Sequence, residues 1–182
     1  MKKVGIFLAQ GFEETEALAT IDLLRRAKVE VDMVSVTGEK YVVSTHGIAI
    51  GADKLLSEVD FDSYDMLIMP GGMPGTRNLE ACEELMAQVE RFYAEGKYLA
   101  AICAAPIIYG HRGMLKDRDA CCYPGFEGEL TDAKVSEEPV CVDGKMITSR
   151  GVGTVIPFGL KLVEILAGKD ESDRISKGIV WK

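Results

Sequence analysis

The chain has 182 residues and a formal net charge of −8, and hydrophobic residues make up 47% of it. Length and composition predict a single globular domain over 1–182. The acidic balance argues against a nucleic-acid partner and against attraction to an anionic membrane. No apolar run approaches the roughly 18 residues that span a bilayer. Acidic residues follow the short N-terminal apolar stretch where a signal peptide would be cleaved, so we expect a cytoplasmic protein.

Short apolar runs alternate with helical patterns along the chain. Period-two or continuous apolar runs predict strands at 3–9, 29–36, 66–70 and 98–103, and helical spacing predicts helices at 14–28, 78–96, from about 105, and 154–168. Residues 140–149 read as a hairpin with Asp143 and Gly144 at its turn. In the first helix, Ala17, Leu18, Ile21 and Leu24 form the apolar stripe.

This alternation predicts an α/β protein with a mostly parallel sheet and helices on both faces. In such sheets ligands bind beyond the carboxyl ends of the strands. Four junctions with small or polar residues lie there: 10–16, 70–77, 103–106 and 149–154. Functional side chains are therefore expected at these junctions.

Cys103 ends a predicted strand and directly precedes a predicted helix. Backbone N–H groups and the helix dipole at such a position lower a thiol's pKa, and the thiolate is the nucleophile. Ala101, Ala104 and Ala105 are small enough for a sharp turn, as in a nucleophile elbow. Free cysteine is also among the most buried residue types, so position alone leaves packing and chemistry both open.

Three glutamates crowd the start of the first helix, where negative charge is favourable. The presence of Glu13 and Glu14 is explained if they lie on the solvated surface, where their charge interacts favourably with the start of the helix. Glu16 lies further in, beside the apolar stripe, so we expect a desolvated carboxyl that could share a proton with a thiolate. In the glycine-rich turn 70–75, the N–H of Gly72 could face an oxyanion, although a plain loop explains the glycines equally well.

The other cysteines have simpler explanations. Cys82 and Cys141 fit packing positions, and of the adjacent Cys121 and Cys122 only one should face inward, which leaves the other exposed to oxidation. Five cysteines without C-x-x-C, and two histidines at no ligand spacing from them, do not predict disulfides or a zinc site. We expect reduced thiols, no metal and no cofactor.

The clearest family signal lies in five segments: GFEETEA, IDLLRRA, IMPGGMPGTRNL, AAICAAP and ITSRGVGT. Together they resemble the ThiJ/PfpI superfamily, and within it they fit the branch of the parkinsonism-associated protein (DJ-one). The resemblance covers nearly the whole chain, in order. It implies a three-layer, flavodoxin-like α/β/α sandwich and a homodimer. It also implies cofactor-independent glyoxalase or deglycase chemistry on small reactive carbonyls, oxidative-stress sensing by a cysteine sulfinate, or chaperone-like protection.

Carried over by residue, the resemblance makes Cys103 the nucleophile and Glu16 its protonated partner. The N–H groups of Gly72 and Ala104 would form the oxyanion pocket, and Arg26 would lie near the dimer interface.

Two positions depart from the family pattern. Protease-like relatives place a histidine where this chain has Ala104, which counts against a cysteine peptidase. The parkinsonism branch places a histidine where this chain has Tyr123, a possible third partner that donates a hydrogen bond but is a poor base at neutral pH. Three hypotheses therefore stand: an enzyme acting on α-oxoaldehydes, a redox-responsive protein without significant turnover, and a binding module.

Overall fold

The computed structural model describes residues 1–181, and its main sheet has seven strands in the order β10-β11-β7-β6-β1-β2-β5. All neighbouring pairs are parallel except β10 with β11. The strands are β1 (Lys3–Leu8), β2 (Glu30–Ser35), β5 (Lys54–Leu55), β6 (Met66–Met69), β7 (Tyr98–Ile102), β10 (Val140–Asp143) and β11 (Met146–Ser149). Two small sheets pair β3 (Tyr41–Val43) with β4 (Ala49–Gly51), and β8 (Asp119–Ala120) with β9 (Lys134–Val135).

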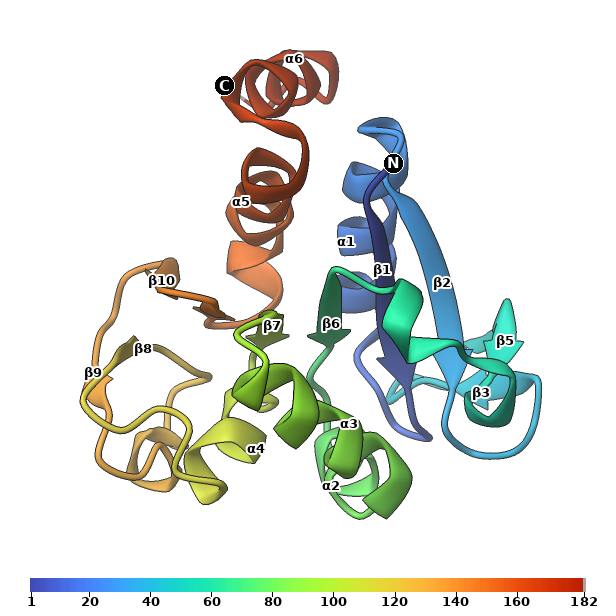
Figure 1. Ribbon diagram of the computed structural model, residues 1–182. Helices are drawn as coiled ribbons and strands as arrows, with labels where there is room; N and C mark the ends of the chain where they lie inside the picture. The colour runs from blue at the N-terminus through green and yellow to red at the C-terminus, as the bar shows by residue number, and fades with distance from the viewer. Residues whose placement is uncertain (182) are drawn as a thin grey trace.

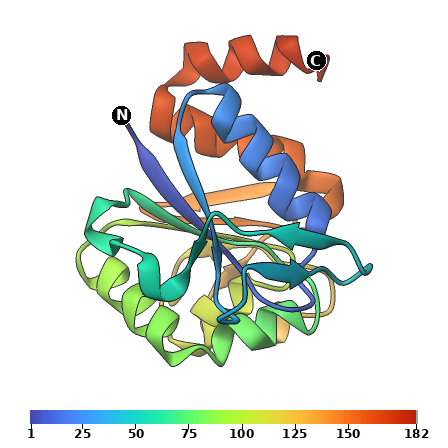
Figure 2. The same cartoon turned by 90° about the vertical axis from the view of Figure 1, so that its right-hand side faces the viewer.

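Helices cover both faces of the main sheet (Figures 1 and 2). One face carries α1 (Glu14–Arg26), α5 (Val155–Ala167) and α6 (Lys169–Gly178), and the other carries α2 (Gly75–Glu80), α3 (Glu83–Ala94) and α4 (Pro106–His111). Short 3₁₀ turns lie at η1 (Leu56–Glu58), η2 (Phe61–Ser63), η3 (Glu127–Glu129) and η4 (Val152–Thr154). The predicted α/β class, parallel sheet and layering are confirmed.

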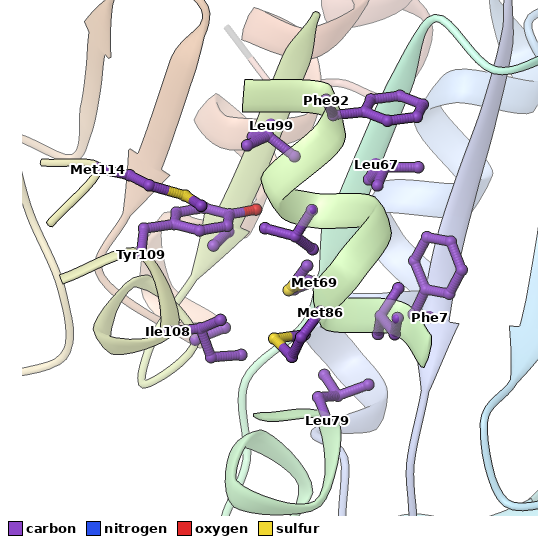
Figure 3. Packing of buried hydrophobic residues seen from close by; sticks show 14 of the residues in the cluster. Phe7, Leu67, Met69, Leu79, Met86, Phe92, Leu99, Ile108, Tyr109 and Met114 are labelled. Carbon is purple, nitrogen blue, oxygen red and sulfur yellow. The ribbon is translucent and has the colours of Figure 1, made fainter. Parts of the chain in front are cut away.

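Each helical layer closes its own apolar core against the sheet. On the α2–α4 side, strand residues such as Phe7, Leu67 and Leu99 meet Phe92 of α3 and Tyr109 of α4, all fully buried (Figure 3). The Tyr109 hydroxyl donates to the carbonyl of Ala100 at 3.1 Å, so this buried polar group is satisfied. The second core packs α1 and α5 on the opposite face of the same strands.

Several elements differ from the sequence expectations. The predicted helix 78–96 is two helices, because Cys82 adopts an extended conformation between them. Leu18 is 38% exposed and lies off the buried stripe of α1, which was predicted to include it. The hairpin β3–β4 and helix α6 were not predicted; α6 is mostly polar and buries little besides Ile175, so its apolar pattern is weak.

The cysteine pair 121–122 also corrects a prediction. Cys121 and Cys122 are both buried, at 0% and 3% exposure, whereas we expected one to face solvent. Strand β8 ends at Ala120, so the alternation of a strand does not apply to them. The peptide N–H of Cys121 donates to the Thr148 hydroxyl at 3.0 Å, which ties this segment to β11.

The four predicted junctions meet at one edge of the sheet. Strands β1, β6, β7 and β11 are neighbours and parallel, so their carboxyl ends lie together. Within residues 1–181, none of the helices combines the length and the apolar character needed to cross a membrane.

Candidate active site

Cys103 sits on a strained turn directly after β7. Its φ is +66°, in the left-handed region that residues other than glycine rarely adopt. The turn is held from both sides, because the N–H of Cys103 donates to the Ser149 carbonyl at 3.0 Å and its carbonyl accepts from the N–H of Tyr123 at 2.7 Å. Helix α4 begins three residues later, at Pro106. The predicted strand-to-helix position of the thiol is therefore where the structure places it.

Glu16 lies beside this thiol, in the first turn of α1. Its side chain is fully buried, and Oε2 accepts a hydrogen bond from the N–H of Gly71 at 2.9 Å. The Cys103 side chain adjoins this carboxyl and affects its pKa, and Oε1 of Glu16 is buried without a hydrogen-bond partner in the described part of the chain. Glu13 caps α1 by accepting the N–H of Glu16 at 2.7 Å, which fixes where the first turn begins.

Burial and the neighbouring groups shift both pKa values of the pair. Burial raises the pKa of Glu16 from 4.5 to about 7. Burial, and then the charge of ionised Glu16, raise the pKa of Cys103, whereas the N–H groups of Gly72 and Ala104 lower it. The lowered thiol pKa expected from position alone is therefore wrong, because burial outweighs the N–H groups of Gly72 and Ala104. Protonation of Glu16 removes the second cause of the raised thiol pKa but not the first, so the protonation states of the two groups are linked.

Two adjacent glycines let the loops around this pair approach closely. A Cβ on Gly71 would lie 2.5 Å from the Cβ of Cys103 and 2.8 Å from Oε2 of Glu16. Gly72 has a φ of +91°, and a Cβ there would lie 2.5 Å from the backbone nitrogen of Glu13. The sequence indicated Gly72 but not Gly71, whose role depends on contacts between three separate segments.

Replacing Gly71 with alanine is expected to destabilise the protein by about 1–3 kcal/mol, because the new methyl group overpacks the thiol–carboxyl pair. Urea unfolding measures this change. Gly128→Ala is the matched control, since Gly128 has open space around its Cα and lies on exposed η3. Equal unfolding midpoints for the two variants would contradict the close packing described for Gly71.

Cys103 and Glu16 open into a cavity of about 450 Å³. Its wall includes Tyr123 and Arg150, together with the 151–154 turn after β11. Tyr123 is about half exposed and packs edge-to-face on Phe126, with ring centroids 6.4 Å apart. The predicted third partner is therefore next to the thiol, and the cavity is large enough for a small carbonyl compound.

The glutamates at the start of α1 are not on a solvated surface, which corrects the sequence interpretation. Glu13 and Glu14 are 8% and 9% exposed, and Glu13 lines the cavity. Glu14 Oε1 lies 2.8 Å from Nδ1 of His46, which the β3–β4 hairpin brings to the cavity wall. Sequence analysis missed His46, because no local signal links residue 46 to the first helix.

A metal ion has one grouping of possible ligands in the described part of the chain. Donor atoms of Glu13, Glu14 and His46 lie within 4.8 Å of one another. Glu13 caps α1 and Oε1 of Glu14 is hydrogen-bonded to His46, so contacts within the chain account for much of the arrangement. Oε2 of Glu14 is buried without a hydrogen-bond partner in the described part of the chain.

Arg26 lies away from the cavity, at the opposite end of α1. Its Nε donates to Asp22 at 2.6 Å, and its carbonyl accepts from Arg174 of α6. Asp22 and Arg26 also line a separate cavity of about 340 Å³ beside the end of α6. Arg26 therefore has no direct part in the thiol site of its own subunit.

A thiol on a strained turn at the carboxyl edge of a parallel sheet, with a buried carboxyl beside it, defines a flavodoxin-like α/β protein with a nucleophile elbow. The DJ-1/PfpI family model matches residues 2–165. The chain belongs to this family, in the branch of the DJ-1 homologues.

Individual relatives agree with this assignment. DJ-1 homologs B and A from Arabidopsis thaliana are each 40% identical to the chain and cover 100% and 96% of it, but the chain spans only 42% and 45% of their lengths. Glutathione-independent glyoxalase DJ-1 from Schizosaccharomyces pombe is 31% identical, with 98% of each protein covered. The solved structure of oxidized Toxoplasma gondii DJ-1 is 37% identical and superposes with a TM-score of 0.95, over 100% of this chain and 99% of that one.

Proposed function

We propose that this protein converts small α-oxoaldehydes such as methylglyoxal to hydroxy acids without glutathione, metal or cofactor. The observation that carries the proposal is the pairing of Cys103 with buried Glu16 in an open cavity, beside the N–H groups of Gly72 and Ala104. The name of the similar Schizosaccharomyces pombe protein, a glutathione-independent glyoxalase, supports the same chemistry. Deglycase-type reactions would start from the same thiol.

In the proposed reaction the Cys103 thiolate adds to the aldehyde carbon and forms a hemithioacetal. The oxygen that becomes negative receives hydrogen bonds from the N–H groups of Gly72 and Ala104. Glu16, as the carboxylate, takes the proton from the former aldehyde carbon and returns it to the neighbouring carbon. The oxygen on that neighbouring carbon takes a proton from solvent, which replaces the one that the thiol released, and the product is a thioester of lactate. Water then cleaves the thioester and releases lactate and the free thiol.

The raised pKa of Glu16 suits this role. At about 7, the carboxyl exchanges its proton readily near neutral pH, as a group that both accepts and returns a proton requires. The test is lactate formation from methylglyoxal without glutathione, and its loss when Cys103 is replaced. A cysteine peptidase is disfavoured, because Ala104 stands where protease-like relatives carry a histidine.

A redox-responsive protein is the second candidate. Cys103 is only partly buried, and the N–H groups of Gly72 and Ala104 that would bind an oxyanion could equally hold sulfinate oxygens. A structural neighbour of this chain is itself an oxidized DJ-1.

Mild peroxide is expected to add about 32 Da, the mass of two oxygens, to the peptide that contains Cys103. Peptide-resolved mass spectrometry measures this addition. Cys82 serves as the internal control, since it is also partly buried but lies at the start of α3, outside the cavity. Equal oxidation of all five cysteines would contradict a specialised thiol.

We also propose that the protein forms a homodimer, as its family resemblance implies. Exposed apolar side chains support the proposal: Leu18 on α1, and Tyr41, Val43 and Ile48 in the β3–β4 hairpin. The two segments adjoin, because the N–H of Thr45 donates to the Phe12 carbonyl at 2.8 Å. Sedimentation equilibrium tests the dimer, and a monomer at micromolar concentration would contradict it.

A further inference from the structure

We propose that His46, oriented by Glu14, is the general base that activates the water which cleaves the Cys103 thioester. The proposal rests on the glyoxalase function proposed above and assigns a residue to its last step. His46 comes from the β3–β4 hairpin, which forms part of neither the strand-end loops nor the motifs that the sequence singled out.

Two hydrogen bonds tie the hairpin to segments next to the site. The N–H of Thr45 donates to the Phe12 carbonyl at 2.8 Å, and its hydroxyl donates to the Met73 carbonyl at 3.2 Å. Phe12 lies just before α1, whose first turn carries Glu16, and Met73 directly follows Gly72. The hairpin thus holds the adjacent residue, His46, in the wall of the cavity that Cys103 and Glu16 line.

Glu14 orients the imidazole. Nδ1 of His46 lies 2.8 Å from Oε1 of Glu14, a pairing that favours the tautomer with the proton on Nδ1 and leaves Nε2 to accept one. Burial acts to raise the pKa of Glu14, but hydrogen bonds from its own N–H, Ser44 and His46 hold that pKa below its usual range. An ionised carboxylate behind a histidine is the arrangement by which hydrolases position a basic imidazole.

The other polar groups of the cavity are engaged or unsuited to this step. Glu16 is fully buried against the sulfur, and Glu13 accepts the N–H of Glu16 as the helix cap. Tyr123 is a poor base at neutral pH, and Arg150 has no accepting atom on its guanidinium. Within a single subunit the His46 side chain is 69% exposed, so water can reach it from the cavity that it lines.

The step balances as follows. A water oxygen attacks the thioester carbonyl carbon while Nε2 of His46 takes one of its protons. The carbon–sulfur bond breaks, its electron pair returns to Cys103, and lactate leaves as the acid. The proton on His46 then passes to solvent or to the thiolate. Glu16 moves protons inside the buried part of the site, and His46 acts where the cavity opens to water.

The test compares His46→Ala with wild type for lactate formation from methylglyoxal. The expected result is a turnover lower by about 10²-fold. Acid-quenched samples are expected to carry an adduct of about 72 Da, the mass of one methylglyoxal, on the Cys103 peptide, because the thioester forms but is not cleaved. Added imidazole is expected to restore part of the turnover of His46→Ala, which a merely structural role would not permit.

His111→Ala is the matched control, since His111 is the second histidine of the chain and is also paired with a carboxylate, Glu80, at 2.7 Å. It lies on α4 and does not line the cavity, so its turnover is expected to equal that of wild type. Glu14→Gln is expected to slow turnover without rescue by imidazole, as for a positioning residue.

Two results would overturn the role of His46 but leave the proposed glyoxalase function in place. The first is a turnover of His46→Ala within twofold of wild type while Cys103→Ala is inactive. The second is a wild-type turnover that EDTA abolishes and zinc restores. The second would make the Glu13, Glu14 and His46 grouping a metal site that activates water. Wild-type protein without any Cys103-dependent lactate formation would overturn the proposed function, and this assignment with it.

Discussion

Replacing Cys103 with alanine is expected to lower glutathione-independent lactate formation from methylglyoxal by at least about 10³-fold. The covalent route begins with this sulfur, and the remaining groups of the cavity offer no other nucleophile of comparable strength. Alanine leaves the backbone of the turn unchanged, so the variant is expected to fold like wild type. Lactate is measured enzymatically, and thermal unfolding checks the fold.

Cys82→Ala is the control for this experiment. Cys82 is partly buried, like Cys103, but lies between α2 and α3, so its replacement is expected to leave turnover unchanged. A Cys103→Ala variant that consumes methylglyoxal at the wild-type rate would exclude the covalent mechanism. Loss of activity in both variants would point to general damage by cysteine replacement.

Replacing Glu16 with glutamine is expected to have two opposite effects, a turnover lower by about 10²-fold or more and a more stable protein above pH 7. The glutamine oxygen can still accept the N–H of Gly71, so the local geometry is kept. Glutamine cannot carry the proton between the two substrate carbons, which explains the lost turnover. It also carries no charge, which explains the gain in stability.

The direction of the pH dependence follows from the raised pKa of Glu16. Unfolded chains release this proton near pH 4.5, whereas the folded protein holds it until about pH 7. The folded state therefore binds more protons between these values, so this carboxyl's favourable contribution to wild-type stability is lost as the pH rises. A pKa rise from 4.5 to about 7 corresponds to about 3 kcal/mol.

Urea unfolding of wild type and Glu16→Gln at pH 4.5 and pH 8 measures this effect. The two proteins are expected to have similar stability at pH 4.5, and the variant to be more stable by about 3 kcal/mol at pH 8. Glu84→Gln, at an exposed position of α3, is expected to follow wild type. Parallel curves for wild type and Glu16→Gln would contradict a buried carboxyl that ionises only near neutral pH.

The thiol site concentrates features that cost stability. A residue other than glycine at a φ of +66° costs about 1–2 kcal/mol, and a fully buried carboxyl beside a partly buried thiol adds a desolvation penalty. A protein core gains nothing from either feature. Strain and buried ionisable groups that occur together are typical of functional sites, which is why the pair of Cys103 and Glu16 carries the proposed function.

Local patterns in the sequence were sufficient for the framework. Alternating apolar runs and amphipathic stripes predicted the parallel sheet and its two helical layers. This was possible because the spacing of apolar residues along a strand or a helix can be seen within a short stretch of sequence. The positions of Cys103 and Glu16 followed from the same logic, since each lies where a strand ends or a helix begins. The order of the motifs identified the family, which the comparisons confirmed.

Only the tertiary structure decided which residues meet across the cavity. Gly71 is restricted by Cys103 and Glu16, two residues distant in sequence, and His46 reaches the cavity because a separate hairpin folds back onto the first helix. The burial of Glu13 and Glu14 depends on the same packing, whereas the desolvation of Glu16 was expected from its place beside the apolar stripe of the first helix. Burial and long-range contacts are properties of the packed chain, and no local sequence period encodes them.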